Sequence, residues 1–97
     1  MDLDNHNVYF RKNDGAWMNS GDPTSGSTGT GAVSLDSALT WWCIGTSSTQ
    51  SVYANYGNGF FGTTAISTEG TNASGIGKFE FNVPTGYTAL CTKGLNN

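Results

Sequence analysis

The chain has 97 residues, enough for one small domain or for part of one, and 36% of them are hydrophobic, 11% charged and 12% aromatic. This combination excludes a disordered tail, because disordered segments are normally highly charged and poor in aromatic residues. The net charge of −3, with four lysines and arginines in all, argues against binding of nucleic acid through its phosphates, and the lack of an apolar run of about 18 residues argues against membrane insertion.

The first turn carries oxygen-bearing side chains at Asp2, Asp4 and Asn5, a pattern that also begins calcium-binding loops. The glycine and the terminal glutamate of an EF-hand loop are missing from the positions where such a loop requires them. We therefore expect a turn whose side chains accept hydrogen bonds from backbone N–H groups, with metal binding at these residues as the weaker alternative.

A β-hairpin is predicted over residues 8–18. Val8 and Phe10 share an apolar face of its first strand, while Tyr9 and Arg11 form a mixed face. The Asn-Asp-Gly sequence that follows is typical of a tight turn, in which we expect the glycine to supply the positive φ. An Ala-Trp-Met segment would then be the return strand.

The middle of the chain alternates between polar stretches and apolar runs. Residues 19–31 contain no large apolar side chain, so we expect an exposed loop with a mobile middle. A continuous apolar run at 39–45 predicts a strand buried on both faces, and 51–56 would return antiparallel to it. A second long Gly/Ser/Thr-rich loop is expected over 57–77, with Phe60-Phe61 near its start as an anchor.

Residues 78–83 alternate apolar and polar side chains, which predicts a strand with its two phenylalanines and its valine inward. A turn is expected at 84–87 and a short final strand at 89–91. Roughly six short strands joined by glycine-rich turns are typical of an antiparallel β-sandwich. The sequence therefore predicts an all-β fold in which residues 1–97 form a single module.

Four segments stand in a distinctive order: Asp-Leu-Asp-Asn at 2–5, Val-Tyr-Phe-Arg-Lys-Asn-Asp-Gly at 8–15, Tyr-Ala-Asn-Tyr-Gly at 53–57 and Pro-Thr-Gly-Tyr-Thr-Ala-Leu-Cys-Thr at 84–92. Together they resemble the C-terminal part of a SPRY domain, a concanavalin-like β-sandwich of the jelly-roll type. The last segment is similar to the ending of SPRY-type modules in tail and fibre proteins of bacteriophages and related marine viruses. Val83 stands where those modules have the first of two prolines.

The resemblance implies that the sandwich is incomplete in this chain alone, because the family has several strands before the Asp-x-Asp turn. The missing strands would come from a longer polypeptide, another copy or another chain. The implied protein is a structural module of a virion, in a tail fibre, spike or other surface appendage. It would assemble as a homo-oligomer or with other virion proteins, on the virion surface or outside the cell.

Such a module would use its loops to contact a host-surface glycan or protein. Two alternatives stay open. One is a purely architectural fibre or capsid-decoration protein with no host ligand, and the other is a SPRY-type peptide-binding adaptor.

Enzymatic activity is not expected, and no cofactor is implied. His6 is the only histidine, and Glu69 and Glu80 are the only glutamates, so neither a nucleophile with its base nor a catalytic carboxylate pair is favoured. Cys43 and Cys91 lack the spacing of a zinc site. Two buried thiols are favoured over a Cys43–Cys91 disulfide, which is the alternative.

Five aromatic side chains are candidates for stacking on sugar rings: Trp17, Trp41, Trp42, Tyr53 and Tyr56. Because large aliphatic residues are few, the same rings must also build the core, and core or subunit contact is favoured over a sugar-binding platform. Neighbours in a strand face opposite ways, so one of Trp41 and Trp42 points away from the core. That residue and Trp17 are the best ligand candidates, and Tyr53 is a further one.

Overall fold

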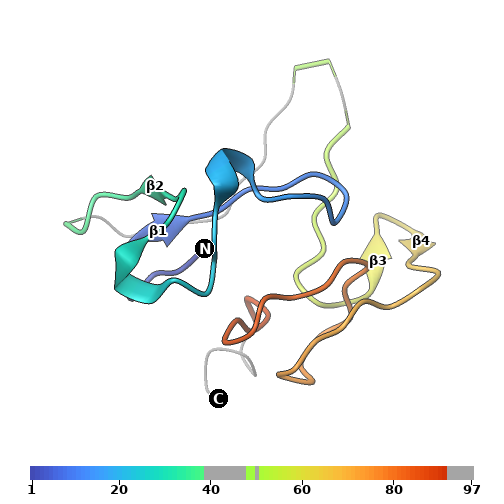
Figure 1. The fold of residues 1–97 in the computed structure, drawn as a ribbon. Helices are drawn as coiled ribbons and strands as arrows, with labels where there is room; N and C mark the ends of the chain where they lie inside the picture. Colours follow the sequence, from blue (N-terminus) through green and yellow to red (C-terminus); the bar gives the residue numbers. More distant parts are fainter. Residues whose placement is uncertain (39–47, 50, 92–97) are drawn as a thin grey trace. The chain divides into compact units, whose positions relative to one another are not determined.

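The computed structural model describes residues 1–38, 48–49 and 51–91. The chain divides into two compact units, Met1–Thr40 and Trp41–Asn97. Within the described residues, regular structure consists of four strands of two residues each and two short 3-10 helices (Figure 1). The chain is β-rich, as expected, and the packing of two sheets into a sandwich remains a prediction.

The first unit is built on a two-stranded antiparallel sheet. β1 (Asn7–Val8) pairs with β2 (Val33–Ser34), so that Asn7 lies opposite Ser34 and Val8 opposite Val33. Upstream of β1, Asp2 and Asn7 exchange two backbone hydrogen bonds of 2.7 and 2.9 Å. These bonds close the first turn of the chain onto β1.

Residues 8–18 double back as predicted, but through one isolated antiparallel bridge between Arg11 and Trp17. The return strand expected at 16–18 does not form, because Met18 begins a 3-10 helix. The face that this hairpin buries is the opposite of the apolar face expected from the sequence. Tyr9 is buried, whereas the side chain of Phe10 is 53% exposed. The reason is that Tyr9 and Trp17 pack against each other across the hairpin, which turns the mixed face inward.

The tight turn of this hairpin is confirmed, but its glycine does not supply the positive φ. The Gly15 N–H donates to the Lys12 carbonyl at 2.9 Å, and the positive φ angles belong to Asn13 (50°) and Asp14 (59°). Positive φ at both central residues is the pattern of a type I′ turn, which asparagine and aspartate tolerate. The prediction placed the unusual backbone at the wrong residue.

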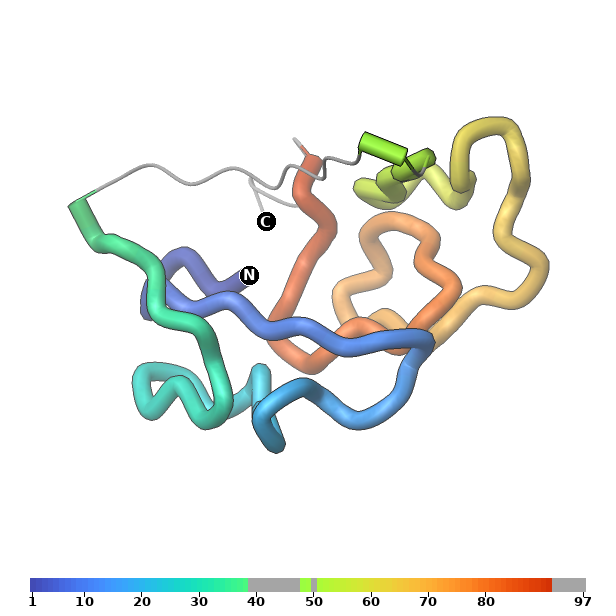
Figure 2. Tube along the Cα trace, turned by 90° about the horizontal axis from the view of Figure 1, so that it is seen from above, coloured from blue at the N-terminus to red at the C-terminus, as the bar shows by residue number. Residues whose placement is uncertain are grey.

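The segment 19–31 is largely exposed, as predicted, and coils into successive turns (Figure 2). η1 (Met18–Ser20) lies at its start and η2 (Gly26–Thr28) in its middle, the part that was expected to be mobile. The Asp22 N–H donates to the Thr30 carbonyl at 3.0 Å and so joins the two ends of the segment. Hydrogen bonds within the segment therefore supplement the packing of Pro23, which is its buried residue.

The second unit contains a hairpin inside the segment 57–77, which was predicted to be a loop. β3 (Phe60–Phe61) pairs antiparallel with β4 (Thr64–Ala65) across a turn in which Gly62 has a φ of 63°. Glycine with positive φ at the first central position suits the right-handed twist of a two-residue hairpin. Phe60 is 43% exposed and Phe61 is half-buried.

Residues 51–56 and 78–83 do not form the predicted strands. The first segment is mostly exposed. The next backbone pairing along the chain is an isolated parallel bridge between Asn58 and Lys78. In the second segment the Phe81 side chain, expected to point inward, is 37% exposed. Alternation of apolar and polar residues was therefore not sufficient to make a strand here.

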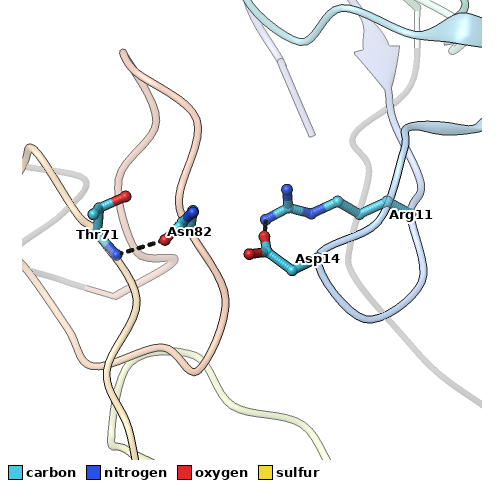
Figure 3. A network of polar contacts seen from close by, with 4 residues as sticks. All are labelled: Arg11, Asp14, Thr71 and Asn82. Carbon is cyan, nitrogen blue, oxygen red and sulfur yellow. Dashed lines mark hydrogen bonds and ion pairs between the residues drawn. The ribbon is translucent and has the colours of Figure 1, made fainter.

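Residues 78–83 contact the chain around Gly70 and Thr71 through irregular hydrogen bonds. The Gly70 N–H donates to the Phe79 carbonyl and the Val83 N–H donates to the Thr71 carbonyl, both at 2.8 Å. The Thr71 N–H donates to the side-chain oxygen of Asn82 at 2.9 Å (Figure 3). Because this amide oxygen takes the place of a backbone acceptor, a regular ladder does not form.

The predicted turn at 84–87 is confirmed, since the Tyr87 N–H donates to the Pro84 carbonyl at 3.2 Å. The final segment 89–91 is not a strand. The strand predicted at 39–45 lies outside the described residues.

The hydrophobic core of the described residues is small. Its buried hydrophobic side chains are Tyr9 in the first unit and Ile76 and Ala89 in the second. Each unit therefore depends on turn hydrogen bonds more than on packing between sheets.

Candidate functional site

Trp17, a ligand candidate from the sequence, packs within the first unit. The Arg11 guanidinium carbon lies 4.6 Å from the centroid of its ring, and Arg11 also pairs with the Asp14 carboxylate at 2.7 Å (Figure 3). The Tyr9 ring meets the Trp17 ring edge-on, with centroids 6.4 Å apart and an angle of 77°. Arg11 therefore occupies one face of the indole ring.

The Tyr9 hydroxyl and the Ser25 hydroxyl form a hydrogen bond of 3.2 Å, which connects this aromatic cluster to the 19–31 segment. The Ser25 hydroxyl oxygen also accepts a hydrogen bond from the Thr30 N–H at 2.9 Å. The Tyr9–Trp17 pair thus holds the hairpin and the polar segment together, which is a structural role.

Tyr53 lies in the second unit with 62% of its side chain exposed. One side of its ring lies over Gly62, where a Cβ atom would come within 2.9 Å of a ring carbon. The exposed ring is thus held beside the β3–β4 turn. The other two candidates, Trp41 and Trp42, lie outside the described residues.

A pocket of about 430 Å³ opens on the second unit. The described residues that line it come from three parts of the sequence and are Ala54, Tyr56, Gly57, Asn58, Ile76, Gly77 and Cys91. Sequence reasoning considered Tyr56 for stacking but did not bring these residues together. The pairs of glycines near 57 and 77 were the available signal.

The floor of the pocket is a place where two backbone segments touch. The Lys78 N–H donates to the Gly57 carbonyl at 3.0 Å. A Cβ atom on Gly77 would lie 2.9 Å from the Gly57 Cα atom and 3.2 Å from the Ala89 Cβ atom. Such a close approach requires glycine at both positions, whose φ angles are also positive, 119° and 83°.

Asn55 fixes the backbone that forms one wall. Its side-chain nitrogen donates to the Lys78 carbonyl at 2.8 Å, and its side-chain oxygen accepts from the N–H groups of Gly57 at 2.7 Å and Gly59 at 3.3 Å. The Asn58 side-chain oxygen in turn accepts from the Phe60 N–H at 3.1 Å. Asn55 thus connects the segment around Gly57 to the segment around Gly77, and both segments line the pocket.

The turn at the start of the chain has the hydrogen bonds predicted for it. Asp2 accepts from the Asn5 N–H at 3.1 Å and from the Asn5 side-chain nitrogen at 2.9 Å, and these bonds hold the pKa of its carboxyl below the usual 3.8. Among the described residues, no group of three or more His, Cys, Asp or Glu side chains is arranged to hold a metal ion. The candidate ligand Asp4 is exposed.

The remaining sequence candidates do not gather into one site. Glu69 and Glu80 are exposed, and His6 is half-buried in the first unit. Cys91 is half-buried at the pocket, and Cys43 lies outside the described residues. In the part of the chain that the structure describes, no helix has the length and apolar character needed to cross a membrane.

Comparison with protein-family models, with curated proteins and with solved structures finds no match to this chain.

Proposed function

We propose that this chain is a non-enzymatic structural module that assembles with further copies of itself or with other virion proteins, in a tail fibre, spike or other surface appendage. The observation that carries the proposal is the imbalance between buried and exposed apolar side chains. Among the described residues the buried hydrophobic ones are Tyr9, Ile76 and Ala89. The exposed large hydrophobic ones are Leu3, Phe10, Met18, Val33, Val52, Tyr53, Tyr56, Phe60, Phe81 and Leu90.

This imbalance lowers the stability of the folded chain when it is not bound to another chain. Small domains already bury a low fraction of their surface, and contiguous exposed apolar surface usually marks a place where another chain binds. Burial of one large apolar side chain contributes about 1.5–3 kcal/mol. Association that covers several of these side chains would therefore contribute substantially to the stability of the folded chain.

The sheets support the same proposal. β1–β2 and β3–β4 are each two-stranded, and an isolated two-stranded hairpin is at best marginally stable in water. Addition of strands from another chain would enlarge these small sheets and so stabilise them.

An adhesive role for the assembled module is favoured by Tyr53. Its ring is 62% exposed and is held against Gly62, so that an aromatic surface is presented without losing much conformational freedom on binding. The proposed target is a host-surface glycan or protein. The competing functions are a purely architectural fibre or decoration protein and a peptide-binding adaptor.

Size-exclusion chromatography with light scattering, run over a range of protein concentrations, tests the assembly. We expect an oligomer whose thermal midpoint rises with concentration, and Phe60→Ser should weaken it while the exposed polar control Ser67→Ala should not. A monomer that unfolds cooperatively at the same temperature at every concentration would overturn the proposal. A glycan array then separates the adhesive role from the architectural one. Specific glycan binding that is lost in Tyr53→Ala supports adhesion, and the absence of binding to any glycan supports a purely architectural role.

A further inference from the structure

We propose that the pocket of the second unit binds the ring of a neutral saccharide. The inference rests on the adhesive part of the proposed function and names the site and the ligand class for it. It goes beyond the sequence candidates, because Asn58, Ile76 and the two glycines of the floor were not among them.

The size and apolar surfaces of the pocket suit a single sugar ring or a short saccharide. Its volume of about 430 Å³ lies within the usual range for small-molecule sites, roughly 300–1,000 Å³. The Tyr56 ring is 45% exposed at the pocket, and Ile76, 6% exposed, is the buried aliphatic residue of its lining. A pyranose has a C–H face that packs on an aromatic ring and an aliphatic surface in the way that other apolar ligands do.

The polar rim offers a hydrogen-bond donor with a fixed direction. The Asn58 side-chain oxygen is held by the Phe60 N–H at 3.1 Å, so the amide is oriented and its NH₂ group is the part that offers hydrogen bonds to a ligand. A sugar hydroxyl can accept from this NH₂ group while its ring lies on Tyr56. Apolar walls with a few fixed polar groups are what distinguish ligand sites from other depressions.

The lining also favours a neutral ligand over a charged one. None of the described lining residues carries a charged side chain. The nearby Lys78 side chain packs along Gly59, where a Cβ atom would lie 3.2 Å from the Lys78 Cβ atom, and it is not among the lining residues. A sialic or uronic acid would therefore bring a carboxylate to described lining residues that include no cation, in a chain whose net charge is already −3.

The pocket is held in shape before any ligand arrives. Gly57 and Gly77 touch through their backbones, and Asn55 fastens Gly57 to the Lys78 carbonyl. Rigid surroundings reduce the ordering cost of binding and so favour the weak, specific contacts typical of a single sugar. Repetition of the site in an oligomer would multiply the effective affinity for a host surface.

Ligand-observed saturation-transfer NMR on the full chain tests the assignment. The probes are a panel of neutral hexoses and N-acetylhexosamines, with sialic acid and glucuronic acid as charged comparisons. We expect transfer to one or more neutral sugars and not to the acids. Tyr56→Leu should weaken binding about tenfold through loss of aromatic stacking, and Asn58→Ala should weaken it further by removing the donor.

The control is Ser67→Ala, at an exposed polar residue outside the lining, which should bind as the unchanged protein does. Circular dichroism and light scattering on every variant separate loss of the site from loss of the fold or of assembly. Sugar binding that survives Tyr56→Leu and Asn58→Ala but is lost in Tyr53→Ala would overturn the pocket assignment and leave adhesion intact. Preferential binding of the acids, or no saturation transfer from an assembled and folded protein to any sugar, would also overturn it.

Discussion

Arg11 and Trp17 face each other across the first hairpin, with the guanidinium carbon 4.6 Å from the centroid of the indole ring. Arg11, a charged residue, therefore takes part in the packing of the first unit. Among the described residues of that unit, Tyr9 is the buried hydrophobic one. Asp14, at 2.7 Å from the same guanidinium, orients the cation from the turn. A hairpin with little apolar surface is thus closed by electrostatic contacts with an aromatic ring.

Replacement of Arg11 by alanine should lower the free energy of unfolding by about 1 kcal/mol, the usual size of a partly exposed cation–π contact with its neighbouring ion pair. Arg11→Lys should lose less, since it keeps the charge but not the planar group. Chemical denaturation checks both, with the exposed neighbour Lys12→Ala as the control. Equal stability of all three variants would show that Arg11 does not stabilise the hairpin.

Asn13 should tolerate glycine and reject β-branched residues, because its φ is 50° in the type I′ turn. Asn13→Val should cost about 1–2 kcal/mol, and Asn13→Gly should be neutral or stabilising. Amide hydrogen exchange at Gly15, whose N–H closes the turn, reports the change locally. If the Gly15 amide exchanges at the same rate in Asn13→Val and Asn13→Gly, the assigned turn type is wrong.

Asn55 should be the most sensitive polar residue of the second unit. Asn55→Ala removes the side-chain hydrogen bonds to the Gly57 N–H, the Gly59 N–H and the Lys78 carbonyl together. We expect the free energy of unfolding to fall by about 2–3 kcal/mol. Faster amide exchange at Gly57 and Gly59 would locate the effect. The exposed Ser67→Ala is the control, and unchanged exchange at both glycines would contradict the role of Asn55.

The first turn should loosen in acid because of Asp2. Its pKa is lowered in the folded chain by the Asn5 side chain, so the stabilisation is fully present above the unfolded value near 3.8 and is lost as pH falls through the lower folded value. NMR of the Asn5 amide, followed on lowering the pH below 3.8, measures this loss. Asp2→Asn should abolish this pH response, whereas the exposed control Asp4→Asn should leave it in place.

The first hairpin shows what the sequence could predict and where it could not. The Asn-Asp-Gly turn followed from local turn chemistry, which depends only on neighbouring residues. The buried face could not be predicted in the same way, because Tyr9 is buried through its contact with Trp17 on the other strand. Alternation alone favoured Phe10, which is exposed.

The second unit was harder to predict because side chains replace the backbone as hydrogen-bond partners. The side-chain oxygens of Asn55 and Asn82 accept hydrogen bonds from backbone N–H groups, as a neighbouring strand does in a regular sheet. The alternation of apolar and polar residues that marks a strand predicts neither interaction. The pocket was missed for a related reason. Gly57 and Gly77 look like ordinary loop glycines until the chain brings them into contact.

The contact between Gly57 and Gly77 has a consequence for how the sequence can change. Since the two segments meet through bare backbone, the junction itself needs glycine at those two positions. Exposed residues of the stretch between them, such as those at 67–69, can change without altering that contact. Diversification of a recognition surface could therefore proceed there while the base that carries it stays the same.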